Sequence, residues 1–259
     1  MSLAKLQDLS GKVALVTGGS RGLGLQMAEV LGELGAKVAI TARKADELEV
    51  AAAHLKALGI TALPLVCDMG KLADIAPMVE KVIAALGPID ILVNNAGTSW
   101  GAPTIEHPLD GWNKVMTLNV TAIFVVTQEV GRRCMVPRKS GKVINIASIQ
   151  GLTGTYPEGM PTLAYNASKG AVVNMTRTLA AEWAPLGINV NAIAPGYFPT
   201  KMTANIADRL GEAATAEMAP MNRVGGPEDL KGITALFASD ACGFITGQTL
   251  AVDGGLTAV

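Results

Sequence analysis

The sequence predicts an α/β fold: a single-domain, doubly wound parallel sheet of the Rossmann-like type, with helices on both faces. Three observations lead to this prediction. From residue 12 onward, short β-branched runs alternate with stretches of helical periodicity. The runs are apolar at successive positions, which is typical of parallel strands buried on both faces. The stretches between them are long enough to contain a helix, so we expect right-handed crossovers.

Length and composition bound both the fold and the partners. The chain has 259 residues, of which 49% are hydrophobic and 17% charged, so we expect one domain over residues 1–259. Its 21 Lys and Arg residues against 22 Asp and Glu residues give a net charge of -1. A chain with so small a net charge lacks the positive electrostatic field that binds nucleic acid or an anionic membrane. We therefore expect a small-molecule partner.

The first half of the chain supplies four expected strands. Val13–Thr17 and Val38–Thr41 are β-branched runs, and the residues between them have helical spacing. That spacing is set by Leu23, Met27, Ala28, Leu31 and Leu34. We expect a third strand at Ala62–Cys67, a helix near Leu72–Leu86 and a fourth strand at Ile89–Asn94.

The second half continues the alternation. The pattern predicts a long helix near Trp112–Val136 and a strand at Val143–Ser148. A second long helix is expected over Leu163–Ala184. Strands at Ile188–Ala194 and Thr249–Val252 complete the sheet.

Two stretches are longer than the usual connections in α/β units, namely Gln150–Pro161 and Tyr197–Pro220. We expect both to be irregular loops. Each follows the carboxyl end of a strand, the edge where open α/β sheets bind their ligands. We therefore predict substrate loops near residues 149–162 and 197–220.

The cysteines and the N-terminus limit the cellular setting. Cys67, Cys134 and Cys242 lie far apart without a CxxC pair, so we expect neither a disulfide framework nor a metal site. The N-terminus lacks the charged start and apolar stretch of a secretory signal. No window approaches the roughly 20 apolar residues that span a bilayer. We expect a cytoplasmic protein that binds no membrane.

A glycine-rich turn directly follows the first strand. Gly18, Gly22 and Gly24 lie in Thr-Gly-Gly-Ser-Arg-Gly-Leu-Gly, and a predicted helix begins at once. Glycines allow a tight turn and let backbone N–H groups approach a pyrophosphate, whose charge the helix N-terminus favours. A plain glycine-rich turn is the alternative, but the position between strand and helix favours a dinucleotide site.

A tyrosine and a lysine lie four residues apart on a predicted helix. Tyr165 and Lys169 therefore share one face, with an ammonium near a phenol. A nearby positive charge favours phenolate, so we expect a lowered pKa for Tyr165 and a group suited to acid–base catalysis. A surface pair is the alternative, and Ser148 at a strand end argues against it.

Several motifs in order resemble the short-chain dehydrogenase/reductase family, in its branch of about 250-residue chains. They are the glycine turn, Asn94-Asn95-Ala96-Gly97, Ser148, Tyr165-Asn166-Ala167-Ser168-Lys169, Pro195-Gly196 and Asp253-Gly254-Gly255. The resemblance spans essentially the whole chain. It implies a doubly wound fold, a nicotinamide cofactor and a homotetramer.

The resemblance also implies catalytic roles. Tyr165 would protonate a carbonyl oxygen during reduction, Ser148 would donate a hydrogen bond to that oxygen, and Lys169 would also hold the nicotinamide ribose. Asn119 matches the asparagine that supports a water-mediated proton path in the family. The alternative for Asn119 is a buried amide bonded to backbone.

Cofactor contacts follow from the same resemblance. Asp68 matches the aspartate that contacts adenine, with a helix N-cap as its alternative. The Pro-Gly of the loop near the carboxamide has an ordinary turn as its alternative. The residues expected to contact the cofactor are Gly18, Ser20, Arg21, Gly22, Leu23, Gly24, Ala42, Arg43, Lys44, Asp68, Asn95, Ala96, Gly97, Tyr165, Lys169, Pro195, Gly196 and Thr200.

The end of the second strand distinguishes NADP(H) from NAD(H). An acidic residue there would accept from the ribose 2′-OH and repel a 2′-phosphate. This chain has Ala42 followed by Arg43 and Lys44, and Arg21 lies in the glycine turn. A guanidinium matches phosphate geometry, so we predict NADP(H). Lys44 has a further interpretation, as the start of a solvated helix.

The substrate is less constrained by the sequence. The interval from Ser148 to Tyr165 is about four residues longer than in the family, and the extra residues fall within 155–161. We expect this insertion to shape one wall of the pocket. Further candidate wall residues are Trp100, Tyr197, Phe198 and Met202. No basic cluster marks the pocket for a carboxylate, so we favour a neutral ketone or aldehyde as substrate.

The main prediction is an NADP(H)-dependent oxidoreductase of the carbonyl reductase or alcohol dehydrogenase type. The first alternative is a 3-oxoacyl-thioester reductase, whose acidic carrier protein would need a basic patch. Such a patch could come from Arg132, Arg133, Arg138 and Lys139. The second alternative is a non-enzymatic NADP-binding regulator.

Overall fold

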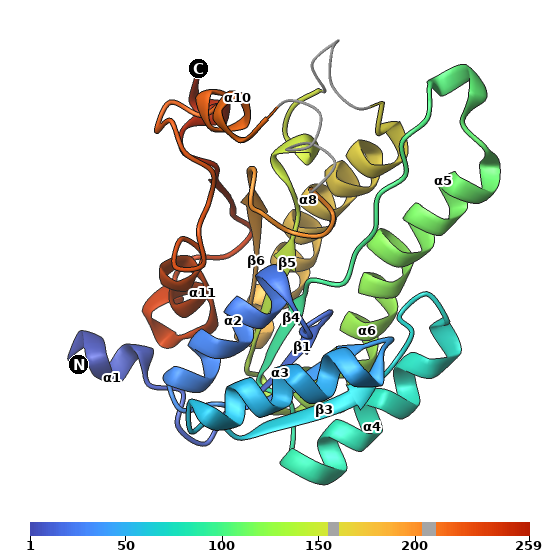
Figure 1. The fold of residues 1–259 in the computed structure, drawn as a ribbon. Helices are drawn as coiled ribbons and strands as arrows, with labels where there is room; N and C mark the ends of the chain where they lie inside the picture. Colours follow the sequence, from blue (N-terminus) through green and yellow to red (C-terminus); the bar gives the residue numbers. More distant parts are fainter. Residues whose placement is uncertain (155–160, 204–210) are drawn as a thin grey trace.

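The computed structural model describes residues 1–154, 161–203 and 211–259. Within these residues it contains one sheet of seven parallel strands in the order β3-β2-β1-β4-β5-β6-β7 (Figure 1). Every neighbouring pair of strands is parallel. The predicted doubly wound parallel sheet is confirmed.

The strand positions agree with the expected ones to within about two residues. They are β1 (Val13–Thr17), β2 (Lys37–Ala42), β3 (Ala62–Val66), β4 (Ile91–Asn94), β5 (Gly141–Ile146), β6 (Ile188–Pro195) and β7 (Thr249–Val252). The largest displacement concerns β5, which ends before Ser148 rather than at it. Ser148 therefore lies just beyond the sheet, where its side chain is available to a site.

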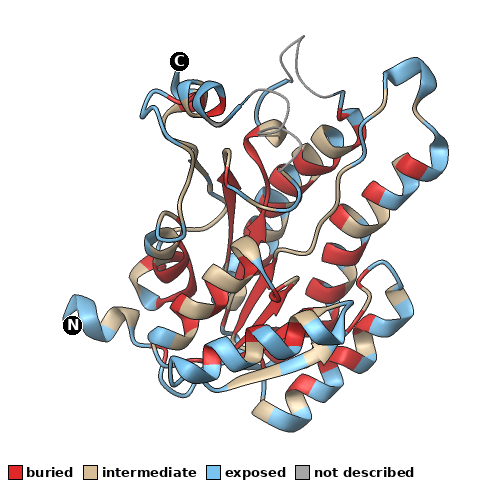
Figure 2. Ribbon diagram, viewed as in Figure 1, coloured by how far each residue is buried: buried red, intermediate tan, exposed pale blue. Residues whose placement is uncertain are grey.

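Burial on both strand faces holds at the centre of the sheet but not at its edge. All residues of β1 and β4 are buried, whereas β3 has none that is fully buried (Figure 2). Because β3 has a strand partner on one side only, Val66 is 62% exposed. Pro64, which lacks a backbone donor, is tolerated in such an edge strand.

Successive side chains of a strand point to opposite faces, and each face has its own hydrophobic core. Val16 of β1 belongs to the core beneath α2 (Gly22–Glu33), α3 (Ala45–Ala57) and α11 (Lys231–Ala238). Leu15, its neighbour, belongs to the core beneath α4 (Ile75–Leu86), α6 (Ala122–Val130) and α8 (Leu163–Trp183). The two helical layers lie on opposite sides of the sheet (Figure 1).

The expected long helix over 112–136 is a composite. It consists of α5 (Leu109–Met116), the π-helical turn η3 (Thr117–Thr121), α6, the π-helical turn η4 (Gly131–Met135) and α7 (Val136–Arg138). A π turn inserts an extra residue and changes the direction of the side chains that follow. Asn119, one of the predicted site residues, lies in η3 and is fully buried.

The remaining helices among the described residues are short. They are α1 (Leu3–Gln7), α10 (Glu212–Glu217) and the 3-10 turns η1 (Leu72–Asp74), η2 (Thr104–Glu106), η5 (Ile149–Gly151), η6 (Ala184–Leu186), η7 (Asp240–Cys242) and η8 (Leu256–Ala258). The expectation of irregular loops is wrong at α10 and at η5, because local hydrogen bonds form helical turns there. Residues 155–160 and 204–210 of the two expected loops lie outside the described residues. Cys67, Cys134 and Cys242 are buried free thiols.

No helix in the described part of the chain is both long and apolar enough to cross a membrane.

A line of buried polar side chains crosses the centre of the sheet. Asn94 on β4 donates to Asn145 on β5 at 2.8 Å and to Thr127 on α6 at 3.0 Å. Asn145 in turn donates to Thr176 on α8 at 2.9 Å. These hydrogen bonds attach α6 and α8 to the two strands whose carboxyl ends border the site.

Replacing Asn145 with Ala should lower the free energy of unfolding by about 2 kcal/mol, because one N–H of the buried Asn94 amide loses its acceptor and the buried Thr176 hydroxyl loses its donor. Urea unfolding measures the effect. Asn174→Ala, an equivalent change at an exposed position on α8, should stay within about 0.5 kcal/mol of the parent. Equal losses in the two variants would contradict a role for the buried network.

Candidate active site

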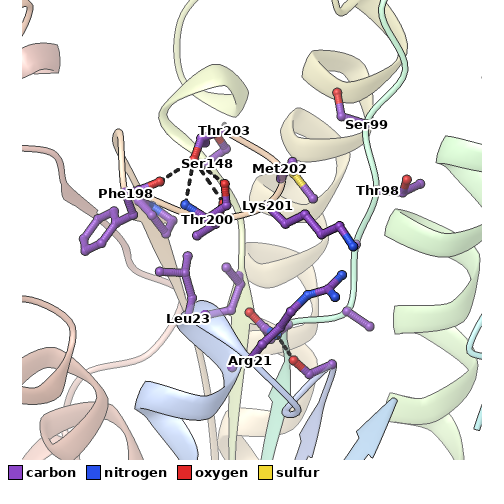
Figure 3. A pocket seen from close by; sticks show the side chains of 18 of the residues that line it. Arg21, Leu23, Thr98, Ser99, Ser148, Phe198, Thr200, Lys201, Met202 and Thr203 are labelled. Carbon is purple, nitrogen blue, oxygen red and sulfur yellow. Dashed lines mark hydrogen bonds between the residues drawn. The ribbon is translucent and has the colours of Figure 1, made fainter. Parts of the chain in front are cut away.

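One cavity of about 1310 Å³ opens at the carboxyl edge of the sheet (Figure 3). Segments that follow six different strands, β1 to β6, contribute to its lining. Because parallel strands end at the same edge, their following loops converge there. Every residue predicted to contact the cofactor lines this cavity, and so does Ser148.

The glycine turn after β1 forms one end of the cavity. Gly18 and Gly22 have φ of 67° and 52°, backbone conformations that favour glycine. A Cβ on Gly24 would lie 2.2 Å from the carbonyl oxygen of Gly18, so only glycine lets α2 begin this close to the turn. The turn exposes backbone N–H groups at the positive end of α2, which fits the pyrophosphate of a dinucleotide.

Asn95 holds this turn against the neighbouring strand. Its side-chain amide donates to the carbonyl oxygens of Thr17 at 3.0 Å and Gly18 at 2.9 Å. The Thr17 hydroxyl accepts from the backbone N–H groups of Asn95 and Ala96 at 3.0 and 3.1 Å. The turn and the segment after β4 are therefore fixed to each other on the floor of the cavity.

Three cations surround the end of β2, where a 2′-phosphate would lie. Arg21, Arg43 and Lys44 line the cavity there beside Ala42. Glu47, which the sequence analysis missed, accepts from Arg21 at 2.6 Å and pairs with Lys44 at 3.3 Å. The three-residue interval between Lys44 and Glu47 at the start of α3 was the sequence signal that could have predicted this ion pair.

The opposite side of the cavity holds Ser148, Tyr165 and Lys169. Ser148 lies close enough to the Tyr165 hydroxyl to lower its pKa. The Lys169 ammonium donates to the carbonyl oxygen of Ile146 at 2.6 Å and lies 5.6 Å from the centroid of the Tyr165 ring. The predicted shared helical face thus places the ammonium beside the phenol.

Burial dominates the proton affinities of these groups. It raises the pKa of Tyr165, and the hydrogen bond from Ser148 opposes this only in part. Burial also lowers the pKa of Lys169 to about 8. The expectation of a lowered pKa for Tyr165 is wrong for this structure, because burial of the phenol raises its pKa and of its neighbours only Ser148 lowers it. Tyr165 therefore keeps its proton at neutral pH.

Asn119 does not line the cavity, and its side chain makes three hydrogen bonds to two residues. Its amide oxygen accepts from the Thr98 N–H at 2.8 Å, and its amide nitrogen donates to the Thr98 carbonyl at 2.9 Å. The same nitrogen donates to Ser168 at 3.0 Å. These contacts correspond to the alternative interpretation, a buried amide bonded to backbone, and they connect the cavity segment at Thr98 to α8.

The remaining predicted contacts line the cavity from separate loops. Asp68 accepts from the N–H of Gly70 at 3.0 Å in a tight turn, while η1 begins after Lys71, so Asp68 is not its N-cap. Gly196 passes so close to Asp253 that a Cβ would lie 2.7 Å from the Asp253 Cβ. Thr200 lies opposite Gly22. A Cβ added to Gly22 would lie 3.5 Å from the methyl group of Thr200.

The expected substrate wall needs one correction. Tyr197, Phe198 and Met202 line the cavity, but Trp100 does not: its ring covers Gly111, and Lys114 lies over it at 5.4 Å. Further basic and polar side chains also line the cavity, beyond those named from the sequence. Lys114, Lys201 and Arg223, together with Thr98, Ser99, Gln150 and Asn222, line the cavity from segments far apart in sequence.

Arg21, Lys201 and Met202 all line this cavity and are labelled in Figure 3. Arg223 is held by Asp229 through contacts of 2.5 and 2.8 Å. Lys201 follows β6, in a segment that the Thr203 hydroxyl stabilises by donating to the Phe198 carbonyl.

Among the described residues no group of three His, Cys, Asp or Glu side chains could hold a metal ion.

Comparison with known proteins identifies the family. A family model described as "Enoyl-(Acyl carrier protein) reductase" matches residues 18–257. The chain is 40% identical over 259 residues to the gluconate 5-dehydrogenase of Gluconobacter oxydans, and the match covers 99% of each chain. A short-chain type dehydrogenase/reductase from Mycobacterium marinum has a TM-score of 0.94 at 37% identity, with both chains covered completely.

The chain belongs to the short-chain dehydrogenase/reductase family. A further solved member, a gluconate 5-dehydrogenase from Burkholderia cenocepacia in complex with NADP and tartrate, has a TM-score of 0.92 at 36% identity. Both chains are covered completely in that comparison. As a short-chain dehydrogenase/reductase, the protein is an oxidoreductase.

The lowered pKa of Lys169 predicts a pH-dependent stability for this short-chain dehydrogenase/reductase. The lysine titrates near pH 8 when folded and near its ordinary value of 10.5 when unfolded. Between these values the unfolded chain binds more protons, so the destabilisation caused by the buried ammonium is relieved as pH rises.

Lys169→Met removes this titration. The free energy of unfolding of the variant minus that of the parent should therefore fall by on the order of 1 kcal/mol between about pH 7 and pH 9.5. Urea unfolding of both proteins without ligand measures the difference. Parallel pH profiles for the two proteins would show that Lys169 is not titrated in this range.

Proposed function

We propose that the protein is an NADP(H)-dependent oxidoreductase that interconverts a carbonyl group and an alcohol, with Tyr165 as the acid and base. The observation that carries this proposal is the shared cavity, which joins the glycine turn to Ser148, Tyr165 and Lys169. A regulator that only binds NADP has no need of such a hydroxyl pair beside a buried lysine. Enzymatic activity is therefore the better explanation of these residues.

When bound, the cofactor supplies or accepts the hydride. Tyr165, which retains its proton at neutral pH, donates that proton to the oxygen of a carbonyl being reduced. The Ser148 hydroxyl, which lines the same cavity, donates its one proton to the same oxygen as a second hydrogen bond. These two donors stabilise the negative charge that develops on the oxygen during reduction.

Lys169 and Asn119 support this pair in different ways. The Lys169 ammonium, beside the Tyr165 ring, stabilises the phenolate left after proton donation. With a pKa of about 8, Lys169 also exchanges its proton readily near neutral pH, which helps to reprotonate Tyr165. Asn119 positions the Thr98 segment and Ser168, the neighbour of Lys169 in the chain. Its proposed part in a water-mediated proton path stays a prediction.

The cofactor is NADP(H). Its 2′-phosphate would be bound by Arg21, Arg43 and Lys44 beside the neutral Ala42, and its pyrophosphate by the glycine turn. Support comes from the related gluconate 5-dehydrogenase that was solved with NADP. Asp68 and the segment Asn95 to Gly97 would contribute the adenine and central contacts, and Pro195, Gly196 and Thr200 those near the carboxamide.

The substrate is a hydroxy or keto acid of the gluconate class. Two matched relatives carry gluconate 5-dehydrogenase activity in their names, and one of them was solved with tartrate, a hydroxy acid. The polar and cationic side chains in the cavity lining, among them Lys114, Lys201 and Ser99, suit such a molecule better than the neutral ketone or aldehyde expected from sequence. Segments near 149–162 and 197–220 are the proposed substrate loops.

A 3-oxoacyl-thioester reductase is the second candidate, because the matching family model is described in terms of an acyl carrier protein. The basic patch expected for a carrier is already neutralised in part. Arg132 and Arg133 pair with Glu129, and Arg138 pairs with Asp90 at 2.8 Å. The gluconate class is therefore preferred. The homotetramer and the cytoplasmic location stay predictions.

A substrate panel with NADPH tests the proposed function. We expect keto acids of the gluconate class to be reduced faster than acetoacetyl thioesters and simple neutral ketones.

Tyr165→Phe should lower turnover of the preferred substrate by about 10² to 10⁴-fold while NADPH still binds, because only the proton donor is lost. Faster thioester reduction would favour the second candidate, and full turnover by the variant would refute the role of Tyr165.

Replacing Ala42 with Asp should shift the preference from NADPH toward NADH by at least about tenfold, or 1.4 kcal/mol, because a carboxylate repels a 2′-phosphate and accepts from a 2′-OH. Kd values for both cofactors measure the shift. Ala53→Asp, which adds the same charge at an exposed position on α3 outside the cavity, is the control. A parent protein that binds both cofactors equally would refute the assignment of NADP(H).

A further inference from the structure

The acidic side chain of Glu47 occupies the cationic end of the cavity. Its Oε1 lies 2.6 Å from Nη1 of Arg21 and 3.3 Å from Nζ of Lys44, and its Oε2 accepts from the Ser20 hydroxyl at 3.5 Å. The carboxylate comes from α3, while Arg21 and Ser20 belong to the glycine turn. Glu47 therefore joins two segments that the chain separates by more than 20 residues.

These partners are the groups that suit a phosphate monoester. Two cations and a hydroxyl donor converge on one oxyanion, as they would on a 2′-phosphate. Arg43 also lines the cavity, and it forms no ion pair within the part of the chain that the structure describes. Two of the three cations at this end are thus already engaged, and one remains available to an incoming ligand.

We propose that Glu47 is an internal stand-in for the 2′-phosphate, and that this residue limits the preference of the protein for NADP(H) over NAD(H). The inference rests on the proposed use of NADP(H). A 2′-phosphate has to displace the Glu47 carboxylate from Arg21 and Lys44, whereas a ligand with a free 2′-OH leaves both ion pairs intact. Glu47 therefore weakens binding of phosphorylated ligands selectively.

The competition is modest, because both ion pairs are partly solvated. The Arg21 and Lys44 side chains are 51% and 59% exposed, and Glu47 is 24% exposed. Pairs of this kind contribute little individually, and salt screens them further. Together they correspond to a change of about three- to tenfold in a dissociation constant.

Glu47→Gln tests the proposal by removing the charge while keeping the size of the side chain. Isothermal titration with 2′,5′-ADP and with 5′-ADP measures binding without a nicotinamide or a reaction. We expect 2′,5′-ADP to bind the variant about three- to tenfold more tightly than the parent, and 5′-ADP to change less than about twofold. The gain should shrink as NaCl is raised.

Two controls separate this effect from a general change of charge. Glu49→Gln removes the same charge from an exposed position on α3 that does not line the cavity, and it should leave both affinities unchanged. In an Arg21→Met, Lys44→Met background, Glu47→Gln should give no gain, because its two partners are absent. Thermal melting without ligand verifies that each variant folds.

The outcomes discriminate between the proposal and its alternatives. Unchanged binding of 2′,5′-ADP by Glu47→Gln would overturn the proposal. Weaker binding would overturn it too, because Glu47 would then preorganise the cations for the phosphate rather than compete with it. A gain that persists in the double-variant background would overturn it as well. If the parent shows no preference for 2′,5′-ADP but Glu47→Gln creates one, the NADP(H) assignment fails and the role of Glu47 stands.

Discussion

The side-chain amide of Asn95 is the contact on which the candidate site depends. It donates to the carbonyl oxygens of Thr17 and Gly18 and so fixes the glycine turn against the end of β4. These two strands are neighbours in the sheet although two strands separate them in the chain, which is where the strand order reverses. An open parallel sheet leaves a crevice at that point, and the amide holds its two walls together.

The two ends of the cavity on either side of this crevice differ in how their charged groups are solvated and paired. At the end of β2, solvated cations are held by Glu47, so charge is available but partly compensated. Beyond β5, Lys169 is buried with a backbone carbonyl as its partner, and burial lowers its pKa while raising that of Tyr165. One end is suited to binding a phosphate, and the other to moving a proton.

Some features follow directly from local sequence. The strands and most helices could be predicted because buried parallel strands and amphipathic helices leave distinct apolar periods. Glycine positions with positive φ, and the four-residue interval between Tyr165 and Lys169, are local properties as well. The π turn around Asn119 and the helix at Glu212–Glu217 left no comparable period, and both were missed.

The sequence by itself determined the parallel sheet, the glycine turn and the residues expected to contact the cofactor, all of which line the cavity. The tertiary structure alone decided which charges meet. It paired Arg21 with Glu47, joined Asn119 to Thr98 and brought Lys114, Lys201 and Arg223 into the lining of one cavity. It also reversed the expected pKa shift of Tyr165. The physical reason is that spacing fixes neighbours along an element, whereas desolvation and ion pairing depend on groups that distant segments bring together.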